Sequence, residues 1–109
     1  MHLRFVEEHV QKVPDQTGIF FLYDERFVVY VGRSAPRSSL KAELMHALAV
    51  AMADDMAVTH FSYEVTHTPK TRATEELRRY FEQWGRLPRY NAAPERREAL
   101  GEHRAELRR

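Results

Sequence analysis

The chain has 109 residues, a length that suits one domain with a single modest hydrophobic core. Apolar residues make up 43% of the sequence and charged residues 30%, which excludes a disordered chain and indicates a globular protein. The formal net charge is only +1, so nucleic-acid binding stays open, because a basic face does not require a basic total.

The sequence also excludes several chemistries and locations. It contains no cysteine, which removes disulfides, thiolate zinc sites and cysteine nucleophiles. No apolar run approaches the roughly 18 residues of a membrane span. The first ten residues, MHLRFVEEHV, carry charges throughout and lack the apolar centre of a signal peptide. We therefore expect a cytoplasmic protein that makes no membrane contact.

The first predicted element is a short amphipathic helix, or a helical turn, at about residues 3–12. Leu3, Val6 and Val10 recur there at helical spacing. Pro14 ends this element.

A β-hairpin is predicted at about residues 18–32. Its two runs, Gly18–Tyr23 and Phe27–Val31, are rich in β-branched and aromatic residues and are separated by a short charged tip. The second run ends in a glycine followed by an arginine and a serine. A strand that ends in this way is suited to contacting phosphate.

Three further elements are predicted after the hairpin. Ser38 or Ser39 is expected to cap a helix that runs to about Ala53. Residues 58–66 alternate in polarity and predict a third strand. A second helix is predicted at about residues 70–84, after a threonine and a proline that suit a helix start.

The last predicted element is an arginine-rich helix at about residues 94–108. The element order is thus helix, strand, strand, helix, strand, helix, helix. This order predicts an α+β fold with a small three-stranded, mostly antiparallel sheet flanked by helices. No linker or repeat interrupts the sequence, so residues 1–109 are expected to form one domain.

Two motifs in the hairpin resemble the signature of the GIY-YIG nuclease superfamily. They are Gly18–Phe20 and Tyr30–Gly32, and the superfamily places the corresponding triplets on adjacent strands. Its members also carry a glutamate in a later helix, which corresponds to Glu76 or its neighbour Glu75, and a loop asparagine, which corresponds to Asn91. The predicted β-β-α-β-α order is similar to that of the superfamily.

The resemblance implies an endonuclease that hydrolyses DNA phosphodiester bonds with a divalent cation. One glutamate would hold Mg²⁺ or Mn²⁺, since magnesium keeps several waters and needs few protein ligands. A tyrosine would position or deprotonate the attacking water, and an arginine would neutralise charge developing on the phosphate. The implied catalytic residues are Tyr30, Arg33, His46 and Glu76, with Glu76 as metal ligand, and the implied nucleic-acid contacts are Arg33, Arg37, Arg89 and Asn91.

Two positions depart from the superfamily pattern. Phe20 replaces the first tyrosine and has no hydroxyl group, and the expected helix arginine falls on Ala42 or Glu43. Arg33 or Arg37 would have to replace that arginine. Losing groups that act as a unit usually costs orders of magnitude in rate. The alternative function is therefore a catalytically degenerate member that binds nucleic acid or a protein partner without cutting.

Each candidate residue also has an ordinary structural explanation. Tyr30 fits a sheet residue with a hydrogen-bonded hydroxyl, and Asn91 fits an asparagine that bonds nearby backbone. Glu76 lies near a helix start, where the helix dipole favours acidic residues. The oligomeric state stays open, and a homodimer is one option because cutting both DNA strands would need two active sites.

Overall fold

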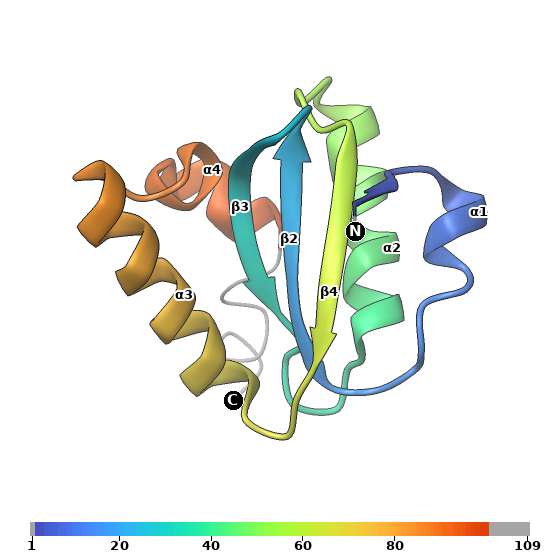
Figure 1. Cartoon of the computed structure of the whole chain (residues 1–109). Helices are drawn as coiled ribbons and strands as arrows, with labels where there is room; N and C mark the ends of the chain where they lie inside the picture. The colour runs from blue at the N-terminus through green and yellow to red at the C-terminus, as the bar shows by residue number, and fades with distance from the viewer. Residues whose placement is uncertain (1, 101–109) are drawn as a thin grey trace.

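The computed structural model describes residues 2–100. They form an α+β fold in which helices pack on a four-stranded antiparallel sheet, and in Figure 1 helix α3 runs along the β3 side of that sheet. In chain order the elements are β1 (Leu3–Arg4), α1 (Glu7–Val10), β2 (Gly18–Asp24), β3 (Phe27–Arg33), α2 (Leu40–Ala53), β4 (His60–Val65), α3 (Pro69–Trp84), α4 (Arg89–Ala92) and α5 (Pro94–Ala99).

The predicted hairpin is confirmed. Strands β2 and β3 pair antiparallel, and the closing pair Asp24 and Phe27 leaves a two-residue loop. The first loop residue, Glu25, has a φ of 58°, the left-handed backbone that such tight turns require. The order of strands in the sheet is β1-β4-β2-β3, so β2 is central and β3 forms one edge.

The sheet has four strands rather than the three that the sequence predicted. Leu3 and Arg4, placed in a helix by their spacing, instead pair with Phe61 and His60 of β4. The helix expected at residues 3–12 is thereby reduced to α1. The physical reason is the open edge of β4, whose backbone groups gain hydrogen-bond partners from β1.

The boundaries of the later helices follow their capping residues. Ser39, not Ser38, caps α2, and its hydroxyl oxygen accepts a hydrogen bond from the Ala42 N–H at 3.2 Å. Helix α3 ends before Gly85, whose φ of 72° is the left-handed conformation that terminates many helices. Of the helix expected at 94–108, α5 covers the first part, and residues 101–109 lie outside the described part of the chain.

The hairpin is buried on both faces, which explains its nearly continuous apolar runs. One face, which includes Phe20 and Tyr30, packs against Leu44 and other apolar residues of α2. The opposite face, which includes Ile19 and Val31, packs against α3. Within residues 2–100, no helix has the length and apolar character needed to cross a membrane.

Candidate functional site

The two motif triplets meet in the sheet. Phe20 lies directly opposite Gly32 on the neighbouring strand, and the rings of Phe20 and Tyr30 pack 6.0 Å apart between centroids. A Cβ atom at Gly32 would lie 2.3 Å from the ring of Phe20 and 2.7 Å from the ring of Tyr30. Glycine is therefore required here, because the two rings occupy the space of a side chain. Phe20 and Tyr30 are both almost fully buried.

A pocket of about 150 Å³ lies beside this aromatic pair, between the edge strand β3 and the N-terminal half of α3. Tyr30, Gly32 and Arg33 line it from the hairpin, and Lys70 and Thr74 line it from α3. The spacing of four residues places these two α3 side chains on one face of the helix. The pocket thus brings together a phenol, a hydroxyl and two cationic side chains.

A second hollow, of about 410 Å³, adjoins the first and shares Arg33 and Lys70 with it. It also includes His67, Thr68 and Thr71 around the N-terminus of α3, where helix N–H groups and the helix dipole favour anions. Among the described residues, neither hollow is lined by an aspartate or a glutamate. We refer to the two hollows together as the Arg33–Lys70 site.

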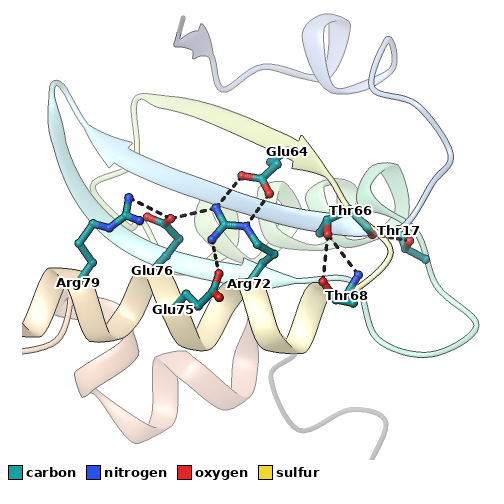
Figure 2. A network of polar contacts seen from close by, with 8 residues as sticks. All are labelled: Thr17, Glu64, Thr66, Thr68, Arg72, Glu75, Glu76 and Arg79. Atoms are coloured by element: carbon teal, nitrogen blue, oxygen red, sulfur yellow. Dashed lines mark hydrogen bonds and ion pairs between the residues drawn. The ribbon is translucent and has the colours of Figure 1, made fainter.

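The predicted metal ligand Glu76 does not line this site. Figure 2 shows it in an ion-pair network centred on Arg72, which joins α3 to β4. The Oε2 atom of Glu76 accepts a hydrogen bond from Arg72 at 2.9 Å and lies 3.3 Å from Nη1 of Arg79. Glu75 also pairs with Arg72, at 2.6 Å, and Arg72 makes a bidentate contact with Glu64 at 2.7 and 2.8 Å. Tyr30 and Arg33 are therefore brought together, whereas Glu76 lies apart from them.

This network does not fit a magnesium site at Glu76 or Glu75. Both carboxylates already bind guanidinium groups, and a cation beside them would meet the positive charge of Arg72. Within residues 2–100, no cluster of three His, Asp or Glu side chains is arranged to hold a metal ion. Mg²⁺ and Mn²⁺ stay predictions from the resemblance.

The Arg72 network also makes the stability of the folded protein depend on pH. Hydrogen bonds from Arg72 hold the pKa of Glu64 below its usual value of 4.5, and the carboxylates raise the pKa of Arg72. Because the pKa of Glu64 is depressed in the folded state, its contribution to stability is present above pH 4.5 and is lost as the pH falls through the lowered value.

We therefore expect Glu64→Gln to flatten the loss of thermal stability below about pH 4.5. Thermal melts followed by circular dichroism over an acid pH series would measure this change. Glu82→Gln is the matched control, because Glu82 is an exposed carboxylate on α3 that lies outside the Arg72 network. Equal pH profiles for wild type and Glu64→Gln would contradict the expectation.

His46, a predicted catalytic residue, and Glu43 both lie on α2 and have structural partners. Nε2 of His46 lies 2.7 Å from the carbonyl oxygen of Ala99, a hydrogen bond that ties α2 to α5. Glu43, at one of the two positions expected for the superfamily's arginine, is 2% exposed and accepts a hydrogen bond from the Ala35 N–H at 3.3 Å. Neither residue lines the Arg33–Lys70 site.

The three other predicted nucleic-acid contacts do not line the Arg33–Lys70 site. Asn91 is 2% exposed, and its side chain accepts from the Val31 N–H at 2.8 Å and donates to the Val31 carbonyl at 3.0 Å. These bonds are those of a structural residue that occupies the edge of β3. Arg37 is exposed in the turn before α2, and Arg89 lies near the opposite end of β3, 3.6 Å from Asp24.

No protein-family model, curated protein or solved structure matches this chain. The resemblance to the GIY-YIG superfamily rests on the motif residues and stays a prediction. Sequence reasoning did not select Lys70 or Thr74, which line the pocket from α3. Their spacing of four residues in the first half of a predicted helix was the signal that could have identified them.

Proposed function

We propose that this protein is a GIY-YIG-like nucleic-acid-binding module that contacts phosphates at the Arg33–Lys70 site and does not cut by a metal mechanism at Glu76. DNA is the partner that the sequence resemblance implies. The single observation that supports this proposal is the cationic lining of the site: Arg33 and Lys70 line both hollows.

The chemistry of the site suits a phosphodiester. Arginine offers a planar fork of N–H donors that matches two phosphate oxygens, and lysine adds a compact positive charge. The threonines at the start of α3 supply hydroxyl groups, and the helix dipole adds positive potential at the same place. Together these groups would bind a phosphate by charge and hydrogen bonding without reading the base sequence.

Cleavage is disfavoured by three features of the chain. Phe20 has no hydroxyl to handle a proton, and a candidate position for the helix arginine is occupied by Glu43, a buried residue that is not a cation. Glu76 is paired with two arginines outside the pocket. These features support the binding alternative over the endonuclease that the motifs first imply.

We expect Arg33→Ala and Lys70→Ala each to weaken DNA binding about tenfold, because each removes one charged phosphate contact. Fluorescence anisotropy with a labelled oligonucleotide between roughly 50 and 200 mM salt would measure the affinities. Each substitution should also reduce the slope of log affinity against log salt by about 1. Arg78→Ala is the matched control, since Arg78 is exposed on α3 and lines neither hollow.

Two results would overturn the proposal. Binding that does not change with salt would exclude phosphate contact as its basis. The second test is cleavage of plasmid, linear or branched DNA in the presence of Mg²⁺ or Mn²⁺. If the wild-type protein and Glu82→Ala cut the DNA but Glu76→Ala does not, Glu76 supports catalysis and the proposal is wrong.

A further inference from the structure

A hollow larger than either part of the Arg33–Lys70 site lies near the other end of α3. It has a volume of about 670 Å³ and lies between the start of β3, the C-terminal end of α3 and the loop before α4. We call it the aromatic–arginine groove after six of its lining residues, Arg26, Phe27, Tyr80, Trp84, Arg86 and Arg89.

The aromatic side chains of the groove are unusually exposed. Phe27 is 64% exposed and Trp84 is 49% exposed, although both offer large apolar surfaces. Tyr80 and Trp84 lie one helical turn apart, with ring centroids separated by 6.0 Å. Ring faces left open to water are the surfaces on which flat ligands stack.

The charge around these rings is mainly positive. Arg26 and Arg86 are both exposed, and Arg89 lies on the same groove. Asp24 is the one acidic residue among the described lining residues, and it is paired with Arg89 at 3.6 Å. The groove thus combines aromatic rings with surrounding cations, the combination that binds single-stranded nucleic acid.

We propose that unpaired nucleobases stack in the aromatic–arginine groove while its arginines contact the neighbouring phosphates. This inference rests on the proposed function and adds a preference for single strands over duplex, since paired bases are stacked inside a duplex and cannot reach the rings. The same strand can reach both sites. Lys70 is in the first turn of α3 and Trp84 is its last residue, about 21 Å away along the helix axis.

Trp84 provides a direct reporter, because it is the single tryptophan of the chain. We expect its fluorescence to be quenched by a thymidine oligonucleotide of about twelve nucleotides, a length that would span both sites. An abasic strand with the same backbone should bind more weakly and leave the fluorescence unchanged. A duplex of the same length should also leave it unchanged.

Substitutions test the groove separately from the Arg33–Lys70 site. In anisotropy with a labelled single strand, Trp84→Ala should weaken binding about 5- to 100-fold, and Trp84→Phe should restore most of the loss. Affinity for duplex should be unchanged. Phe81→Ala is the matched control, because Phe81 is 53% exposed on the same helix but does not line the groove. Circular dichroism would show that each variant is folded.

The outcomes separate this inference from the proposed function. If the wild-type protein binds no oligonucleotide, both fail. If Arg33→Ala weakens binding but Trp84→Ala behaves like Phe81→Ala and no quenching occurs, the stacking groove alone is overturned. If an acidic peptide quenches Trp84 and the oligonucleotide does not, the groove binds a protein partner instead.

Discussion

Replacing Gly32 by alanine is expected to lower the free energy of unfolding by about 3 kcal/mol, at the upper end of the usual cost of overpacking a core. The new methyl group would lie 2.3 Å from the Phe20 ring and 2.7 Å from the Tyr30 ring. These rings are 1% and 2% exposed, so neither can move aside without disturbing the core. Urea denaturation followed by circular dichroism would measure the change.

Two variants show whether the rings cause this effect. Gly85→Ala should cost only about 1 kcal/mol, because Gly85 has a left-handed backbone but no neighbour within 4 Å of an added Cβ. Combining Gly32→Ala with Phe20→Leu should cost less than the sum of the two single changes, since leucine frees part of the ring's space. A Gly32→Ala protein as stable as Gly85→Ala would refute the steric explanation.

Replacing Asn91 by alanine is also expected to destabilise the fold strongly, by about 2–4 kcal/mol. The substitution leaves the N–H and carbonyl groups of Val31 without their side-chain partner at a position that is 4% exposed. Unpaired buried backbone groups carry the full cost of losing water. The same urea experiment would measure this change.

The Asn91→Asp variant makes this role pH-dependent. Its carboxylate can still accept from the Val31 N–H, but it faces the Val31 carbonyl with a second acceptor in place of a donor. Protonation restores a donor, so the variant should lose less stability relative to wild type in acid than at neutral pH. If Asn91→Ala instead weakened DNA binding without destabilising the protein, Asn91 would be a nucleic-acid contact as the resemblance implied.

The sequence predicted those parts of the fold that depend on neighbouring residues. Runs rich in β-branched and aromatic residues and a charged tip predicted the hairpin, and a serine predicted the start of α2. The strand β1 could not be predicted in this way. Leu3–Arg4 becomes a strand only because β4, more than fifty residues later, offers it an open edge.

In the candidate site, too, some features depend on neighbouring residues in the sequence and others on tertiary packing. The sequence by itself placed Tyr30, Gly32 and Arg33 at one end of a strand, because an apolar β-branched run and a terminating glycine are local properties. Which helix residues join them was decided only by the packing of α3. Ala73 and Leu77 pack against Ile19 and Val31, which turns Lys70 and Thr74 toward the pocket. The ion pairs of Glu76 with Arg72 and Arg79 are contacts between helix neighbours, which the local spacing favours. Only the packing of α3 on the sheet brings Arg72 to Glu64 of β4 and so joins Glu76 to that network.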